Sequence, residues 1–155
     1  VPAVASVHFD DLVHGVLPRQ TKISRKVPGR LTEEQVLATN IDTAFIVQAL
    51  DGSFNPRVMQ RHLVMVREGG VQPIVVLNKS DLCADVSQKV VAAEAAAGDA
   101  RVVAVSAATG LGMEHLAPFI LPGRTIVFLG SSGVGKSTLI NQIYGEELLA
   151  TTEVR

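Results

Sequence analysis

The sequence predicts an α/β fold in which helices cover both faces of a parallel β-sheet, giving three layers. Short apolar runs alternate with segments of helical periodicity from residue 43 to residue 144. A glycine-rich segment at residues 130–138, GSSGVGKST, joins one such run to the helical segment after it. Polar clusters follow two other apolar runs, where the carboxyl ends of parallel strands form a ligand-binding edge.

The start of the chain predicts short β structure and a linker. Residues 1–26 are β-like, with a second strand at residues 12–17 that Pro18 ends. Residues 27–30, Val-Pro-Gly-Arg, are punctuated like a linker. Residues 32–35, Thr-Glu-Glu-Gln, carry a capping-box pattern and predict the start of a short helix.

The apolar runs after residue 40 are continuous, which is typical of strands that are covered on both faces. They predict strands at residues 43–47, 73–77, 102–105 and 125–129. Right-handed crossovers between these strands would place all their carboxyl ends at one edge of the sheet.

The segments between these runs carry helix signals. Asn55 supplies an N-cap, Pro56 suits the first helical position, and apolar residues at 59, 63 and 66 share one face. Gly69 and Gly70 end this helix. Further helices are predicted at residues 86–97, 113–119 and 137–144.

The glycine-rich segment fits the phosphate-loop pattern G-x-x-x-x-G-K-[ST] at every fixed position, which indicates a P-loop NTPase fold. Glycines let backbone N–H groups turn inward around phosphate oxygens, and the helix N-terminus adds a partial positive charge. Lys136 would reach the β- and γ-phosphates as the catalytic charge, Ser137 would hold Mg²⁺, and Thr138 would lie near the α-phosphate. The other nucleotide-binding residues predicted in this loop are Ser131, Ser132, Gly133, Val134 and Gly135. The alternative is an ordinary turn rich in glycine and serine.

Asn78-Lys79-Ser80-Asp81 follows one predicted strand and suits a guanine reader. The Asp81 carboxylate can accept hydrogen bonds from N1–H and from the 2-amino group of guanine, a pair of donors that adenine lacks. Asn78 can bond the purine edge and tie neighbouring loops together, and the Lys79 stem can lie over the base plane. The alternative is a polar turn in which Asp81 caps the next helix.

Ser106-Ala107-Ala108 follows another predicted strand, and the N–H group of Ala107 can donate to guanine O6. Taken alone, this sequence is more typical of a small-residue turn. Three loops that each follow a parallel strand project to the same edge, however. Together they predict a site for GTP or GDP with Mg²⁺.

The densest basic stretch of the chain contains Arg19, Lys22, Arg25, Lys26 and Arg30. One interpretation is an edge that contacts RNA, and the other is a solvated loop beside a domain boundary. The net charge of the 155 residues is only −1, so the composition does not indicate a general polycation.

The remaining composition restricts the class of protein. One cysteine excludes an internal disulfide framework and a cysteine-cluster zinc site, and it fits a reducing compartment. No apolar run approaches the roughly 20 residues of a membrane span, and no signal peptide is predicted at the N-terminus. The chain lacks an initiator methionine and stops soon after the P-loop helix, so we expect a piece of a longer protein.

The order of the motifs resembles that of the circularly permuted GTPases. In Ras-like GTPases the P-loop comes first, whereas here N-K-S-D and S-A-A precede it. Within that group the chain is most similar to the ribosome small-subunit-dependent GTPase A family. Leu17-Pro18-Arg19 and Ser24-Arg25 resemble the end of the family's OB-fold, and Arg61-His62-Leu63-Val64 resembles its approach to the guanine motif.

The resemblance implies a cytoplasmic GTPase that acts in late assembly of the small ribosomal subunit and contacts its rRNA partly through the OB-fold. It implies the end of an OB-fold-like domain at residues 1–27, a linker at 28–40 and an incomplete permuted GTPase domain at 41–155. The D-x-x-G motif, the switch threonines and a zinc-binding domain would lie beyond Arg155. We therefore expect this piece to bind nucleotide and to hydrolyse GTP slowly. RNA contacts are expected from Arg19, Lys22, Arg25 and Lys26.

Three other functions remain open from the sequence. The first is an adenine-nucleotide P-loop enzyme, in which residues 78–81 form only a turn. The second is an RNA-binding module with a vestigial nucleotide site. The third is a permuted GTPase that acts in assembly of the large ribosomal subunit.

Overall fold

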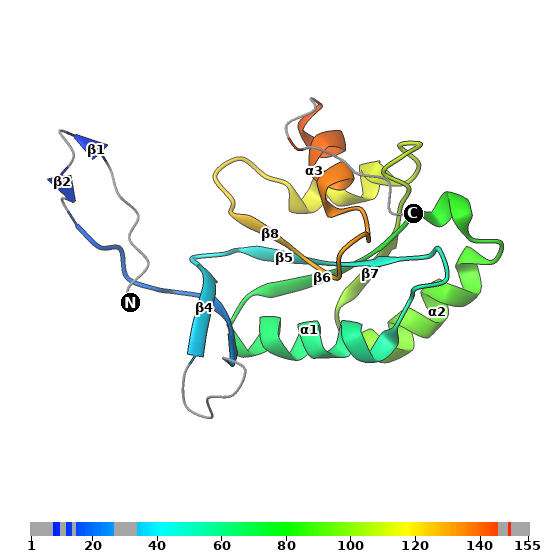
Figure 1. Ribbon diagram of the computed structural model, residues 1–155, viewed down its shortest axis with the longest axis horizontal. Coiled ribbons are helices and arrows are strands. Elements are labelled where there is room, and N and C mark those ends of the chain that lie inside the picture. The colour runs from blue at the N-terminus through cyan, green and yellow to red at the C-terminus, as the bar shows by residue number, and fades with distance from the viewer. Residues whose placement is uncertain (1–7, 10–11, 14, 27–33, 146–148, 150–155) are drawn as a thin grey trace.

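The computed structural model describes residues 8–9, 12–13, 15–26, 34–145 and 149. At the centre of these residues is a parallel sheet of four strands in the order β7-β6-β5-β8 (Figure 1). The strands are β5 (Thr43–Ala49), β6 (Gln72–Asn78), β7 (Arg101–Ala104) and β8 (Ile126–Leu129). β5 pairs in parallel with both β6 and β8, so the carboxyl ends of these three neighbours meet at one edge.

Helices cover both faces of this sheet, which confirms the predicted three layers. On one face lie α1 (Pro56–Glu68) and α2 (Val86–Ala97) (Figure 1). On the other lie α3 (Lys136–Tyr144) and the 3₁₀ segment Met113–Phe119. No helix in the described part of the chain is both long enough and apolar enough to cross a membrane.

β5 is buried along its whole length because it lies between two apolar cores. Ile46 packs in the core on the side of α1 and α2, whereas Phe45 packs on the opposite face with Leu139 of α3. The centroid of the Phe45 ring lies 5.2 Å from that of Phe128 and 6.5 Å from that of Phe119. The contact with Phe128 stabilises β8 against β5, and the loop that follows β8 therefore begins at a fixed position.

α1 begins and ends where local signals place it. The side-chain oxygen of Asn55 accepts hydrogen bonds from the N–H groups of Arg57 and Val58, at 3.0 and 3.3 Å. Pro56 is the first helical residue, and Gly69 closes the last turn. The predicted bounds of this helix are confirmed.

β3 (Lys22–Lys26) and β4 (Glu34–Thr39) form an antiparallel hairpin that packs beside α1. Ile23 is fully buried and joins the core on the α1 side. The N–H group of Lys22 donates to the carbonyl oxygen of Gly69 at 3.1 Å, directly after α1. The hairpin is therefore attached to the sheet domain by both apolar and backbone contacts.

Two predictions for the start of the chain are corrected by the structure. The strand predicted at residues 12–17 is only β2 (Leu12–Val13), which pairs with β1 (His8–Phe9) away from the main sheet (Figure 1). The helix predicted from residue 32 is wrong, because Glu34 and Gln35 begin β4. Residues 32 and 33 themselves lie outside the described part of the chain.

Contacts across the hairpin explain why the capping signal fails. Lys22 Nζ donates to both carboxylate oxygens of Glu34, at 2.9 and 2.8 Å, and this bond holds the pKa of Glu34 below its ordinary value. Arg25 Nε donates to Gln35 Oε1 at 2.9 Å. Both side chains of the expected capping region thus bind the neighbouring strand. β4 also occupies much of the segment predicted as a linker at residues 28–40.

Replacing Ile23 by valine should lower the free energy of unfolding by about 1 kcal/mol, because it removes one buried methylene-sized group between β3 and α1. Chemical denaturation of the chain measures this difference. The matched control is Leu37→Ala on the same hairpin, where the side chain is exposed and the change should stay under about 0.5 kcal/mol. A larger loss for Leu37→Ala than for Ile23→Val would contradict docking of the hairpin through Ile23.

Candidate functional site

The loop from β8 to α3 is built on glycines with left-handed φ values. These are 152° at Gly130, 80° at Gly133 and 92° at Gly135. A Cβ atom on Gly130 would lie 2.4 Å from the carbonyl oxygen of Val47, and one on Gly135 would lie 2.3 Å from Nδ2 of Asn78. The loop therefore packs against the ends of β5 and β6 more closely than a side chain permits.

Lys136 is the first residue of α3, and its ammonium group folds back over this loop. Nζ donates to the carbonyl oxygens of Gly130 and Ser131, at 2.9 and 2.8 Å. Burial lowers the pKa of Lys136 from its ordinary value. Among the described residues no side chain caps the first turn of α3, so backbone N–H groups without a capping partner and the Lys136 side chain both belong to this end of the helix. This arrangement suits an anion.

Asn78, at the end of β6, ties this loop to a third one. Its Nδ2 donates to the carbonyl oxygen of Val134 at 2.9 Å. Its Oδ1 accepts from the N–H group of Ala107 at 3.0 Å. The side chain is almost completely buried, so these bonds are shielded from water. The prediction that Asn78 ties neighbouring loops together is confirmed.

The bond from Ala107 revises one part of the sequence interpretation. The sequence assigns the N–H group of Ala107 to guanine O6, but in this structure that group donates to Asn78. Ala107 is also buried, whereas the next residue, Ala108, is exposed. The amide of Ala107 is therefore an internal tie between two loops.

Asp81 lies on the short turn after Asn78, with its carboxylate held from the Ser106 loop. The buried hydroxyl of Ser106 donates to Asp81 Oδ1 at 2.5 Å and accepts from the N–H group of Thr109 at 3.2 Å. The capping role considered for Asp81 is wrong, because Asp85 caps α2 by accepting from the N–H group of Gln88. Asp81 is exposed, so its carboxylate can also accept hydrogen bonds from a ligand.

Lys79 has a left-handed backbone, with φ of 61°, and its ammonium is held by an aspartate that sequence reasoning missed. Nζ lies 2.7 Å from Asp51 Oδ2 in the loop after β5. Asp51 Oδ1 accepts from the hydroxyl and the N–H group of Ser53, at 2.6 and 3.2 Å. The hydrogen bonds from Lys79 and Ser53 lower the pKa of Asp51 to about 2. An Asp-Gly pair at the end of a buried strand, on the edge that carries the motifs, is the signal that could have found it.

A family model described as RsgA GTPase matches residues 16–155. The chain belongs to the RsgA GTPase family. The resemblance seen in the order of the motifs is thereby confirmed at the level of the family.

Curated relatives from two organisms agree with this membership in the RsgA family. A protein named small ribosomal subunit biogenesis GTPase RsgA, from Xylella fastidiosa, is 50% identical over 141 residues. That match covers 90% of this chain and 41% of the relative. A protein of the same name from Opitutus terrae is 48% identical over 135 residues, covering 87% of this chain and 37% of the relative. The chain thus spans about two fifths of the length of these relatives.

Two solved structures match the fold of this chain. YjeQ from Thermotoga maritima matches with a TM-score of 0.67 and 28% identity, over 84% of this chain and 44% of that protein. YloQ, described as a circularly permuted GTPase, matches with a TM-score of 0.58 and 26% identity, over 86% of this chain and 46% of that protein. The predicted α/β fold with permuted order is confirmed by these matches.

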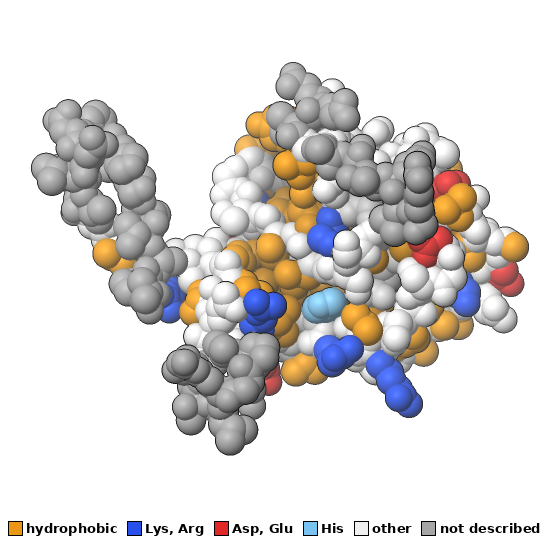
Figure 2. All heavy atoms as spheres, viewed as in Figure 1, with side chains coloured by type: hydrophobic (Ala, Val, Ile, Leu, Met, Phe, Trp, Pro, Cys, Tyr) orange, Lys and Arg blue, Asp and Glu red, His pale blue; other side chains and the backbone are white. Residues whose placement is uncertain are grey.

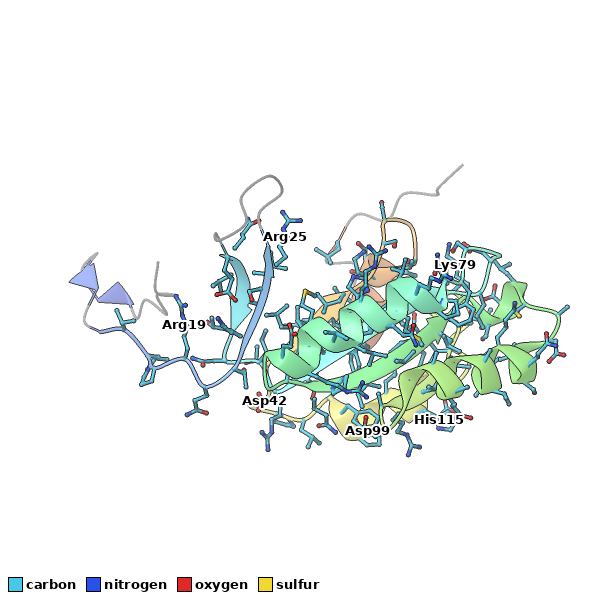
Figure 3. All side chains as sticks on the ribbon, turned by 90° about the horizontal axis from the view of Figure 1, so that it is seen from below. Arg19, Arg25, Asp42, Lys79, Asp99 and His115 are labelled. Carbon is cyan, nitrogen blue, oxygen red and sulfur yellow. The ribbon has the colours of Figure 1, made fainter. Side chains whose placement is uncertain are left out.

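In this RsgA family chain the basic residues predicted to contact RNA lie away from the three loops. On the face drawn in Figure 2, the Lys and Arg side chains of the described residues are scattered and form no continuous patch. Figure 3 shows Arg25 on the β3–β4 hairpin and Arg19 near it, both separated from Lys79 along the long axis of the molecule. Lys22 is paired with Glu34, and the side chain of Lys26 lies outside the described part. Residues 22–26 form β3, so the interpretation as a loop is wrong for this part of the basic stretch, and Arg30 lies outside the described residues.

Proposed function

We propose that this chain is the guanine-nucleotide-binding part of a cytoplasmic GTPase that acts in late biogenesis of the small ribosomal subunit. Membership in the RsgA GTPase family supports the proposal, as do the names of the curated relatives. The observation that carries it is the buried amide of Asn78, which bonds the phosphate loop and the Ser106 loop at once. The side chain of Asn78 thus connects the loop proposed to bind the phosphates with the loop proposed to bind the base.

The phosphates would be held by the loop between β8 and α3. Its backbone N–H groups, from Ser131 to Thr138, and the ammonium of Lys136 would surround them, with the first turn of α3 adding its dipole. Lys136 would give up its two carbonyl partners in favour of phosphate oxygens. The Ser137 hydroxyl, in this same turn, is the kind of oxygen ligand that Mg²⁺ takes. When bound, Mg²⁺ neutralises negative charge that develops on the phosphates.

The base would be read by the loops that Asn78 joins. Asp81 would accept from guanine N1–H and the 2-amino group, oriented by the hydroxyl of Ser106. Lys79 would cover one face of the base. Because the amide of Ala107 is engaged with Asn78, we propose the N–H group of the exposed Ala108 as the donor to guanine O6.

The whole protein would add what this chain does not supply. Hydrolysis of GTP and contact with the small subunit and its rRNA are proposed for that longer protein, with Arg19, Lys22, Arg25 and Lys26 as candidate RNA contacts. Figure 3 labels two of these, Arg19 and Arg25. We propose residues 1–27 as the end of an OB-fold-like domain and residues 41–155 as permuted GTPase domain. No group of three potential metal ligands occurs among the described residues, and the zinc expected from the resemblance is proposed for another region.

Titration of this chain with fluorescent GDP and with fluorescent ADP tests the proposal. We expect GDP to bind at least about 100-fold more tightly, since adenine would leave the Asp81 carboxylate without its two donors. Equal binding, or a preference for ADP, would contradict it and would favour an adenine-nucleotide enzyme. RNA binding that ignores nucleotide and weakens with salt would instead favour an RNA-binding module.

A further inference from the structure

The ion pair between Lys79 and Asp51 joins two of the loops that follow parallel strands. Asp51 follows β5 and Lys79 follows β6, and the N–H group of Leu50 donates to the carbonyl oxygen of Asn78 at 2.8 Å between them. Both side chains are about three-quarters buried, at 26% and 28% exposed. The pair is therefore better shielded from water than an ordinary surface ion pair.

Asp51 is itself fixed from a second side. The hydroxyl and the N–H group of Ser53 both donate to Asp51 Oδ1, so Oδ2 is the oxygen that meets the ammonium of Lys79. The same contacts keep Asp51 ionised, since they hold its pKa at about 2. The carboxylate is thus an anchor with one defined orientation.

A lysine side chain has four rotatable bonds, and ordering it costs conformational entropy when a ligand binds. Here the ammonium is already fixed at its far end by Asp51, while the left-handed backbone of Lys79 fixes its near end. The aliphatic stem between those two points is held in place before any ligand arrives. Asp81 lies two residues further along the same turn, so a base read by Asp81 would lie beside that stem.

We propose that Asp51 is a positioning residue for the base: it holds the Lys79 stem as a preformed shelf for the purine ring. This inference rests on the proposed function, because it assumes a guanine nucleotide at the three loops. Asp51 does not touch the phosphates in this role, so its contribution falls on the base alone.

The test compares the wild-type chain with Asp51→Ala, Asp51→Asn and Asp51→Glu in titrations with fluorescent GDP. Asp51→Ala should weaken GDP binding about three- to tenfold, and Asp51→Asn nearly as much. Asp51→Glu, which restores a carboxylate, should recover part of the loss. Inorganic pyrophosphate, which has no base, should compete for the site with the same affinity in every variant.

Two further variants distinguish positioning from a general structural role. In a Lys79→Ala background, adding Asp51→Ala should cause no further loss of GDP affinity. Asp99→Ala, in the turn before β7, removes the carboxylate of an exposed ion pair with Arg67 and should leave GDP binding unchanged. Unchanged GDP affinity in Asp51→Ala, or an equal loss for pyrophosphate, would overturn the inference while leaving the proposed function intact. Failure of the wild-type chain to bind GDP would overturn both.

Discussion

An Asp81→Asn variant should bind GDP at least about 100-fold more weakly than the wild-type chain and should gain affinity for XDP. The reason is the hydrogen bonding of the Ser106 hydroxyl group. Its hydroxyl oxygen accepts from Thr109, so its proton points to Oδ1 of residue 81. In the variant the amide oxygen would keep that bond, which turns the amide nitrogen toward the base. The amide N–H group then faces the 2-amino group of guanine, which is also a donor. Xanthine instead carries a carbonyl oxygen at C2, which can accept a hydrogen bond from that amide.

Competition titrations with GDP and XDP measure this exchange of preference. The matched control is Asp85→Asn, four residues away, where asparagine replaces the N-cap of α2 with an equally good cap. That variant should keep the wild-type preference and stability. If Asp81→Asn still bound GDP as tightly as the wild-type chain, the assignment of Asp81 as the reader of the base edge would be wrong.

Replacing Gly135 by alanine should lower nucleotide affinity at least about 100-fold and destabilise the chain by about 2–4 kcal/mol. The new Cβ would lie 2.3 Å from Asn78 Nδ2, so the Asn78 side chain must move. It would then lose its buried bonds to Val134 and Ala107. The φ of 92° adds backbone strain, because alanine disfavours this region. A single methyl group therefore disturbs the phosphate loop and the base loops together.

Gly145→Ala is the control for the strain term. Gly145 ends α3 with φ of 79°, and a Cβ there meets nothing within 4 Å. It should cost about 1 kcal/mol of stability and leave nucleotide affinity unchanged. Denaturation and GDP titration of both variants separate the two contributions. Equal nucleotide affinity in the two variants would show that the clash with Asn78 has no consequence for the site.

Local sequence signals predicted the sheet domain because its elements are locally specified. The buried strands are unbroken apolar runs, since both their faces are covered. Asn55, Pro56 and Gly69 set the bounds of α1 through contacts with its own backbone. The positions of Asn78 and Asp81 follow from parallel strands ending at one edge, which is a topological rule and needs no side-chain detail.

Contacts between distant residues could not be predicted in the same way. The capping pattern wrongly predicted a helix where β4 begins, because Glu34 pairs with Lys22, twelve residues earlier. Asp51 was missed because its partner Lys79 lies 28 residues further on. The engagement of Ala107 by Asn78 depends on a register between loops that no local pattern carries. In each case the deciding partner lies at least 12 residues away in the sequence.

The position of β8 beside β5 has a consequence for synthesis of the chain. The Thr125 N–H group reaches the carboxylate of Asp42, 83 residues earlier, and β8 pairs along β5 from there. On a nascent chain β5, β6 and β7 emerge first, and each pairs with a strand close to it in the sequence. The loops that would read the base can thus form early during translation. Pairing of β8 with β5 comes later, because it closes a long segment of chain. Within these residues, phosphate capture would then be acquired after the loops that read the base have formed.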